Sequence, residues 1–282
     1  MRVSRSAFYA WAAGKSAGES AEKRQRAERV KAIFYRHRRR YGQRRIKAEL
    51  EACGEKLGRA AIRSLMQAQN LQAIQPKRFV PRMTNSNHSL RPSPNLLKEA
   101  ENQASEAGAV LVGDITYLPL ASGSWCYLAI WQDKFTRRIV GWKVAEQMTD
   151  ELVIAALEKA LHGGWVKRNA IIHTDRGSQY VSKDFRQLLQ TGQLRQSMSA
   201  KGNCYDNAQA ESFFSRFKTE LVEDGLFESV EQARGEAFDY IEAYYNRIRR
   251  HSSLGYKSPL EYEADLKIKE KGASESFVSC KT

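Results

Sequence analysis

Apolar residues recur every three or four positions over the first quarter of the chain, which is the spacing of amphipathic helices. The pattern predicts three short helices, over residues 22–37, 46–53 and 60–70. Glycines stand between the second and the third, where one helix is expected to end and the next to begin. Residues 1–73 are therefore expected to form a small all-helical domain.

The third of these helices presents two faces of different chemistry. Its apolar stripe consists of Ile62, Leu65 and Met66, and its other face carries Arg59, Arg63 and Gln67. Arginine pairs with guanine and glutamine with adenine in the major groove of DNA, and two short helices joined by a glycine turn have the layout of a helix-turn-helix. Any small basic three-helix unit would show the same pattern, so both interpretations stand at this point.

The segment after residue 73 has neither a helical nor a strand period. It is basic and turn-rich, and residues 76–94 hold four of the six prolines. We expect an interdomain linker over residues 74–106.

The pattern changes at Val110. Runs rich in β-branched and aromatic residues predict three antiparallel strands, over 109–120, 125–133 and 137–146. Helix and strand then alternate over 149–164, 169–175, 182–190 and 194–199, and helices follow over 208–222, over 229–246 and after Pro259. This order describes a mixed α/β layer fold over residues 107–265 with a tail over 266–282. The ribonuclease-H-like architecture has this order, although the string of elements alone does not single it out.

The charge of the chain is concentrated at one end. Of 282 residues 42% are apolar and 28% are charged, enough for a sizeable core, and the net charge is +14. Residues 1–98 hold 23 Lys and Arg against 6 Asp and Glu, whereas residues 99–282 hold 23 against 26. A basic first third predicts a polyanionic partner, most often a nucleic acid, without distinguishing DNA from RNA.

Other classes of protein are disfavoured by the sequence. The apolar runs are too short to span a membrane, and the N-terminus has no apolar segment of a secretory signal. The four cysteines are scattered, with no C-x-x-C pair. We therefore expect a cytoplasmic chain without a disulfide framework or a membrane partner.

Three acidic residues lie where an α/β sheet could bring them together. Asp114 is in the first predicted strand of the sheet, Asp175 ends the fourth, and Glu211 is on a helix; 60 and then 35 residues separate them. Singly, each has an ordinary explanation, such as a turn cap for Asp175. Together, their hard oxygen ligands suit Mg²⁺ or Mn²⁺. Three carboxylates could hold two such ions about 4 Å apart, the arrangement used in phosphoryl transfer.

Several ordered motifs resemble one family. They are VGDITYL, YLAIWQDKFTRRIVGW, HTDRGSQY, SMSAKGNCYDNAQAESFFSRFKTE and YIEAYYNRIRRHSSLGYKSP. Over roughly residues 30–262 the chain resembles the second-frame transposases of bacterial insertion sequences, which share the retroviral-integrase core. The resemblance implies a ribonuclease-H-like core in which Asp114, Asp175 and Glu211 bind two catalytic metal ions, preceded by a helix-turn-helix-like domain. It also implies metal-dependent cleavage and transfer of DNA strands at the ends of an insertion sequence.

The resemblance adds candidate DNA contacts. Lys218 follows Glu211 by two helical turns and is expected to hold a DNA phosphate. Lys201 and Asn203, in the glycine-bearing loop before that helix, are expected to approach the phosphate backbone.

The sequence departs from the family pattern at Leu111, where the family usually has Trp three residues before the first Asp. No heptad run is present, so the chain resembles the catalytic partner of an upstream-frame DNA-binding polypeptide. We expect a homo-oligomer that acts on double-stranded DNA in the bacterial nucleoid. Two alternatives are a catalytically inactive DNA-binding regulator and a structure-specific nuclease of the same fold; the three intact acids favour the transposase over the regulator.

Overall fold

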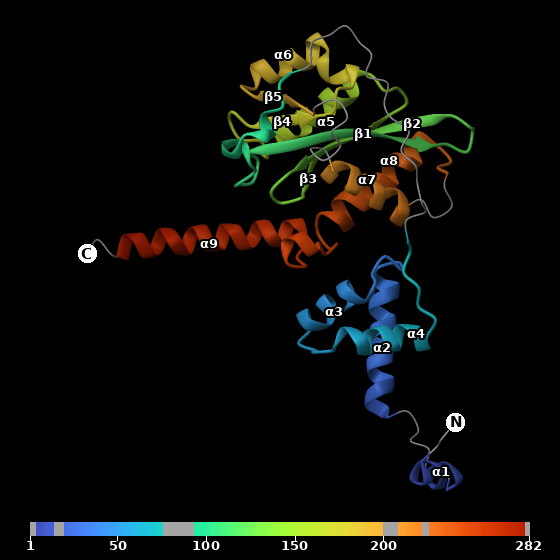
Figure 1. The fold of residues 1–282 in the computed structure, drawn as a ribbon. Helices are drawn as coiled ribbons and strands as arrows, with labels where there is room; N and C mark the ends of the chain where they lie inside the picture. Colours follow the sequence, from blue (N-terminus) through green and yellow to red (C-terminus); the bar gives the residue numbers. More distant parts are fainter. Residues whose placement is uncertain (1–3, 14–19, 76–92, 200–207, 222–225, 280–282) are drawn as a thin grey trace. The chain divides into compact units, whose positions relative to one another are not determined.

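The fold was obtained as a computed structural model (Figure 1), which describes residues 4–13, 20–75, 93–199, 208–221 and 226–279. Contacts divide the chain into two compact units, Met1–Gln75 and Pro76–Thr282.

The first unit is entirely helical. Its helices are α1 (Arg5–Ala12), α2 (Ala21–Arg36), α3 (Gln43–Ala52) and α4 (Arg59–Ala68). The side chain of Ser20 accepts a hydrogen bond from the backbone N–H of Lys23 and so caps the start of α2. After α3 the chain turns at Gly54, whose φ of 80° suits glycine. The three expected helices are confirmed; α1 was not expected.

The second unit is built on a five-stranded sheet. Its strands are β1 (Val110–Pro119), β2 (Trp125–Asp133), β3 (Ile139–Ala145), β4 (Ile171–Thr174) and β5 (Arg195–Met198), in the order β3-β2-β1-β4-β5. The first three strands are antiparallel neighbours, and β4 and β5 run parallel to β1. The expected mixed sheet is thus confirmed, with β1 at its centre.

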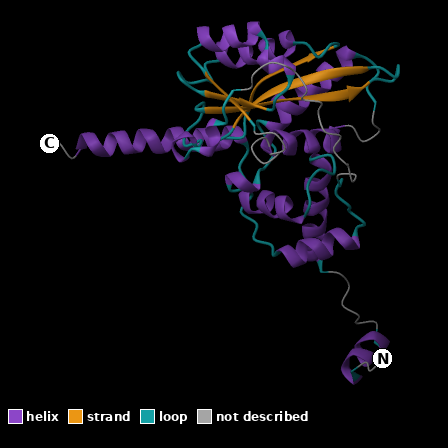
Figure 2. Ribbon diagram, turned by 45° about the horizontal axis from the view of Figure 1, so that its top comes forward, coloured by secondary structure: helices purple, strands orange, loops and turns teal. Residues whose placement is uncertain are grey.

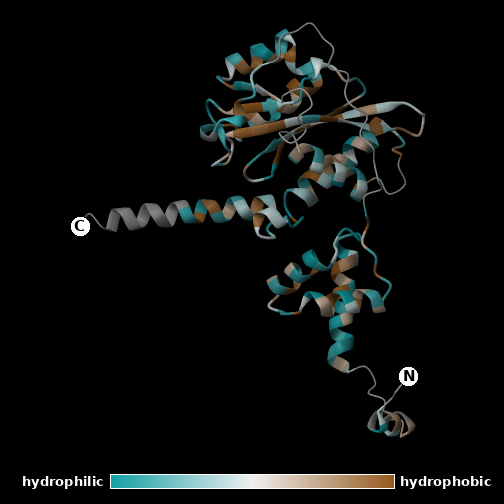
Figure 3. Cartoon of the chain, in the orientation of Figure 1, coloured by the Kyte–Doolittle hydropathy of each residue, from teal (hydrophilic) through white to brown (hydrophobic). Residues whose placement is uncertain are grey.

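Helices cover both faces of the sheet (Figures 1 and 2). Helices α5 (Asp150–His162) and α6 (Lys183–Thr191) cover one face, and α7 (Ala208–Leu221) and α8 (Val230–Phe238) cover the other. The central strands β1 and β2 contribute apolar side chains to the core on each face of the sheet, as sheets covered on both sides require. Figure 3 shows the hydrophobic stretches of these strands. Gly141 lets α5 lie close, because a Cβ there would be 2.1 Å from the backbone oxygen of Ala156.

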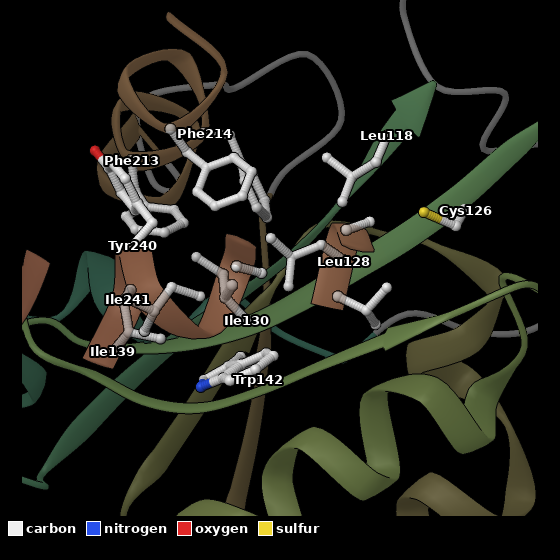
Figure 4. Packing of buried hydrophobic residues seen from close by; sticks show 14 of the residues in the cluster. Leu118, Cys126, Leu128, Ile130, Ile139, Trp142, Phe213, Phe214, Tyr240 and Ile241 are labelled. Atoms are coloured by element: carbon white, nitrogen blue, oxygen red, sulfur yellow. The ribbon is translucent and has the colours of Figure 1, made fainter. Parts of the chain in front are cut away.

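The core beneath α7 is aromatic and aliphatic (Figure 4). Phe213, Phe214 and Phe217 of α7 are buried in one cluster with Leu128 and Ile130 of β2. Because the strand alternates, β1 contributes Val112 and Leu118 to the same cluster, and Asp114, two residues from Val112, belongs to that face of the strand. The sequence pattern therefore places Asp114 on the face that α7 covers.

The helix expected over 229–246 changes its winding. After α8 the chain continues as a π-helix, Asp239–Tyr245, in which the backbone N–H of Asn246 bonds the oxygen of Ile241, five residues earlier. The wider turn buries both Tyr240 and Tyr245 on the core side. Apolar periodicity alone does not distinguish this winding from an α-helix.

Part of the expected linker packs on the sheet. Residues 76–92 lie outside the described part of the chain, but Leu97 is buried against Val110 and Ile171. The backbone N–H of Leu96 donates to Ser197 Oγ at 3.0 Å. This stretch forms two short 3₁₀ helices, Leu96–Lys98 and Ala100–Asn102.

The remaining elements complete the second unit. Two further 3₁₀ helices lie at Ser178–Val181 and Ser252–Leu254, and α9 (Pro259–Ser279) continues through most of the expected tail. Arg138 pairs with Glu263 at 2.8 Å and so holds the first turns of α9. Among the helices described, none has the length and apolar character needed to cross a membrane.

Candidate active site

Main-chain pairing brings the first two acids side by side. Residues Val110, Leu111 and Val112 of β1 pair with Ile171, Ile172 and His173 of β4. Asp114 and Asp175 each follow the last of these pairs by two residues in their own segment, and the charge of Asp175 raises the pKa of Asp114, so the two carboxylates lie near each other. Neighbouring strands are about 4.8 Å apart. Two carboxylates are therefore held together at the centre of the sheet.

The carboxylate of Asp114 lies in a charged and partly desolvated environment. One oxygen, Oδ1, accepts a hydrogen bond from the backbone N–H of Ile115 at 2.9 Å. Burial raises the pKa of Asp114 well above its usual value, and the charges of Asp175 and Glu211 raise it further. The Ile115 bond and the ammonium group of Lys218 oppose this rise. Such a group gains from a nearby cation.

Asp175 is held in the turn that follows β4. Its Oδ1 accepts a hydrogen bond from the backbone N–H of Gly177 at 2.9 Å, and burial raises its pKa while this bond lowers it. A Cβ on Gly177 would lie 3.1 Å from Asp175 Oδ1. Glycine at this position therefore leaves room for the carboxylate.

Helix α7 carries the third acid and a cation on one flank. Glu211 and Lys218 are both exposed, seven residues apart and so on the same side of the helix. Partial desolvation and then the charge of Asp175 raise the pKa of Glu211. Partial desolvation lowers the pKa of Lys218, whereas Asp114 raises it. Both α7 groups thus lie within electrostatic reach of the two strand acids.

Asp133, a fourth acid of the sheet, has a different environment. It is buried, with 2% of its surface exposed, and accepts hydrogen bonds from the backbone N–H groups of Gly108, Phe135 and Thr136. Three donors satisfy this carboxylate, so its role is to fix the turn after β2. In contrast, Asp114 and Asp175 each accept one hydrogen bond within the described part of the chain.

The donor set fits a hard divalent cation. Asp114, Asp175 and Glu211 supply only carboxylate oxygens, the ligands that Mg²⁺ and Mn²⁺ prefer. Burial, and then the charge of Asp175, raise the pKa of Asp114 and of Glu211, so a nearby cation would favour their ionised forms. Within the described ranges, no three acidic, histidine or cysteine side chains are already grouped closely enough to enclose an ion.

Some of the candidate DNA contacts lie within the described part of the chain and others do not. Arg59, Arg63 and Gln67 are exposed on α4, beside the buried stripe of Ile62, Leu65 and Met66. The expected outward face of this helix is thus present. Lys201 and Asn203 lie outside the described residues.

One polar group near the acids was not singled out from the sequence. Tyr180 is 2% exposed, and its hydroxyl has no hydrogen-bond partner among the described residues. Burial raises the pKa of Tyr180 well above its usual value, and the charges of Asp175 and Asp114 add to the rise. The sequence offers one signal for a role of Tyr180 near the acids: it stands in the motif HTDRGSQY, five residues after Asp175.

Comparison with known families agrees with this arrangement. Residues 104–204 and 192–259 match the integrase core domain, and residues 21–79 match an HTH-like domain. With the mixed sheet, these matches confirm the ribonuclease-H-like core and the helix-turn-helix-like domain expected from the sequence. The solved catalytic core domain of HTLV-2 integrase aligns at a TM-score of 0.45 with 15% identity, covering 57% of this chain and 99% of that one.

Curated relatives match over nearly the whole chain. Transposase InsF for insertion sequence IS3A of Escherichia coli (strain K12) is 40% identical over 265 residues, which is 93% of this chain and 91% of InsF. The transposase for insertion sequence element IS904 of Lactococcus lactis is 38% identical over 237 residues, 84% of this chain and 92% of the relative. The chain therefore belongs to the family of insertion-sequence transposases that includes InsF, and it is a polynucleotidyl transferase that acts on DNA in transposition.

Proposed function

We propose that Asp114, Asp175 and Glu211 form the catalytic centre with which this transposase cleaves DNA at the ends of its insertion sequence and joins the ends to target DNA. The observation that supports the proposal is the parallel pairing of β1 with β4, which ends two residues before both Asp114 and Asp175, on the sheet that α7 covers. Burial raises the pKa of all three acids, and the charge of another member of the set adds to the rise for Asp114 and Glu211.

We propose that the three carboxylates hold two Mg²⁺ or Mn²⁺ ions. When bound, such ions lower the pKa of a water or a DNA 3′-hydroxyl and stabilise the departing 3′-oxygen. In this proposal the chain supplies the placement of the ligands: Asp114 and Asp175 extend from the paired strands β1 and β4, and Glu211 comes from α7, which packs on the same sheet.

Lys218 is proposed to position the DNA. It lies on the same flank of α7 as Glu211 and within the field of Asp114, so its ammonium group can bind a phosphate beside the carboxylates. In the first unit, Arg59, Arg63 and Gln67 are proposed to read bases in the major groove. Lys201 and Asn203 are proposed as further backbone contacts.

The partner of the chain is DNA, since both matched families and its relatives act on it. We propose double-stranded insertion-sequence ends and target as substrates, and action at the bacterial nucleoid in the cytoplasm. A second copy of the chain and an upstream-frame polypeptide are proposed as protein partners.

The test is strand transfer on a duplex that carries an insertion-sequence end, with Mg²⁺ or Mn²⁺ and with any partner polypeptide supplied. Asp175→Asn and Glu211→Gln should each reduce cleavage and joining to background while leaving DNA affinity unchanged. Asp184→Asn, which changes an exposed acid at the start of α6, is the matched control and should stay active. Full activity in EDTA, or an active Asp175→Asn variant, would refute the proposal. DNA binding without cleavage by the unaltered chain would instead favour an inactive regulator.

A further inference from the structure

Helix α7 has three functional surfaces around its axis. Its buried stripe, Ala210, Phe214 and Phe217, faces the core. At about 100° per residue, Glu211 and Lys218 project from one flank of that stripe and Glu220 from the opposite flank. Any rotation of α7 that moves Glu220 therefore moves Glu211 by the same angle.

Both carboxylate oxygens of Glu220 accept hydrogen bonds from neighbouring side chains. Arg249 donates from Nη2 to Glu220 Oε1 at 2.6 Å and from Nε to Glu220 Oε2 at 2.9 Å. The hydroxyl of Tyr240 donates to Glu220 Oε2 at 2.9 Å. The Arg249 and Glu220 side chains are 3% and 4% exposed. Two parallel bonds between planar groups fix direction as well as distance.

The same C-terminal segment also holds the start of α7. The ring of Tyr245 meets the ring of Phe213 edge to face, with centroids 4.9 Å apart. The hydroxyl of Tyr245 accepts a hydrogen bond from Gln132 Nε2 of β2 at 2.8 Å. Residues 240–249 thus hold α7 at Phe213 and at Glu220, and connect it to a strand next to β1.

Stability alone does not account for this ion pair. Replacing a buried ion pair by apolar side chains of similar size is often neutral or stabilising, so charge at this place is better explained by the geometry it imposes. The apolar contacts of the phenylalanine stripe are non-directional, so they would tolerate a small rotation of the helix. A bidentate ion pair would not tolerate such a rotation, because its two hydrogen bonds fix direction.

We propose that Glu220 and Arg249 are positioning residues of the transposition reaction, which set the rotation of α7 and thereby keep Glu211 and Lys218 directed toward Asp114 and Asp175. This inference rests on the proposed function of Glu211. The pair itself touches neither DNA nor ion; it acts through the helix.

The test compares two double variants of the full chain. Glu220→Leu/Arg249→Met removes the pair, and Glu263→Leu/Arg138→Met removes a partly buried pair, 2.8 Å apart, that lies away from α7. The measurements are Tm without metal, the rise in Tm on adding Mn²⁺, DNA affinity and strand transfer.

The Glu220/Arg249 double variant should keep a cooperative thermal transition, with a Tm close to that of the unaltered chain. Its Mn²⁺-induced rise in Tm should be largely lost, and strand transfer should fall about 10- to 100-fold, the scale of a misplaced catalytic group. DNA affinity should not change. The control double variant should keep both the Mn²⁺ response and strand transfer.

A folded Glu220/Arg249 double variant with an unchanged Mn²⁺ response and unchanged strand transfer would overturn the inference. Should that variant not fold, Tyr240→Phe removes one bond to Glu220 and keeps the ring; unchanged Mn²⁺ response and activity in it would overturn the inference equally. Glu211→Gln separates the two hypotheses. If Glu211→Gln is active, the proposed function fails; if it is inactive while the double variant is normal, only the positioning role fails.

Discussion

Replacing Asp114 with asparagine is expected to stabilise the metal-free protein while ending catalysis. The change keeps the size of the side chain and leaves an oxygen to accept the hydrogen bond from the Ile115 N–H. It removes one negative charge from a partly desolvated place beside Asp175 and Glu211. The folded state then has less repulsion to overcome, and the proposed metal site loses a ligand.

The magnitude follows from the strand register. Carboxylates on neighbouring strands about 5 Å apart repel by about 3 kcal/mol at an effective dielectric constant near 20, and by about 1 kcal/mol in water. Because Asp114 is partly exposed, we expect the free energy of unfolding to rise by about 1–3 kcal/mol at neutral pH. For a unit of this size each kcal/mol raises Tm by about 2–4 °C.

The sign of the pH dependence is fixed by the direction of the pKa shift. The pKa of Asp114 is raised in the folded state from its ordinary value of 3.8. Its contribution to stability is therefore complete below that value and is lost as pH rises through the folded pKa. The stability gained by Asp114→Asn should be negligible near pH 3 and should grow between pH 4 and neutral.

The assay is thermal unfolding in EDTA across this pH range, with strand transfer measured on the same samples in Mn²⁺. Asp133→Asn is the matched control: it replaces a buried acid that accepts three backbone hydrogen bonds, so it should lower stability by about 1–3 kcal/mol. A destabilised Asp114→Asn variant, or one that retains strand transfer, would refute the reasoning.

Three further predictions concern other parts of the chain. Arg63→Ala should relax sequence preference by about 1–3 kcal/mol in binding competitions; an equal loss on every DNA sequence would mark a phosphate contact instead. Lys218→Gln should lower affinity for all sequences and reduce the salt slope of binding by about 1; an unchanged slope would exclude the phosphate contact. Gly141→Ala should destabilise the second unit by about 1–3 kcal/mol in thermal unfolding, because its Cβ would meet the Ala156 backbone oxygen at 2.1 Å; an unchanged Tm would show that α5 can shift freely.

Much of the fold follows from periodicity. Strands β1 to β3 are rich in β-branched and aromatic residues, and α2 to α4 carry regular apolar stripes, so their positions could be predicted from the sequence. The proximity of Asp114 and Asp175 is different. It depends on the parallel register of β1 and β4, and sequence spacing alone could only suggest it.

What could not be predicted depends on contacts between distant segments. Leu97 packs against Ile171 within a stretch whose prolines and polar residues are typical of a linker. The bidentate pair joins Glu220 to Arg249 across 29 positions, and the π-helix that precedes Arg249 has no periodic signature. Such features arise from packing, which overrides local preference.

The strand register also determines where the catalytic unit can be lengthened. The main-chain pairing of β1 with β4, and not the number of residues between the two acids, brings Asp114 and Asp175 near each other. The 60 intervening residues include the exposed turn at 121–124, which joins β1 to β2. A peptide tag inserted after Gly123 would extend a surface loop at small entropic cost and leave both acids in place. This turn is accordingly a suitable position for attaching a fluorescent label to a working transposase.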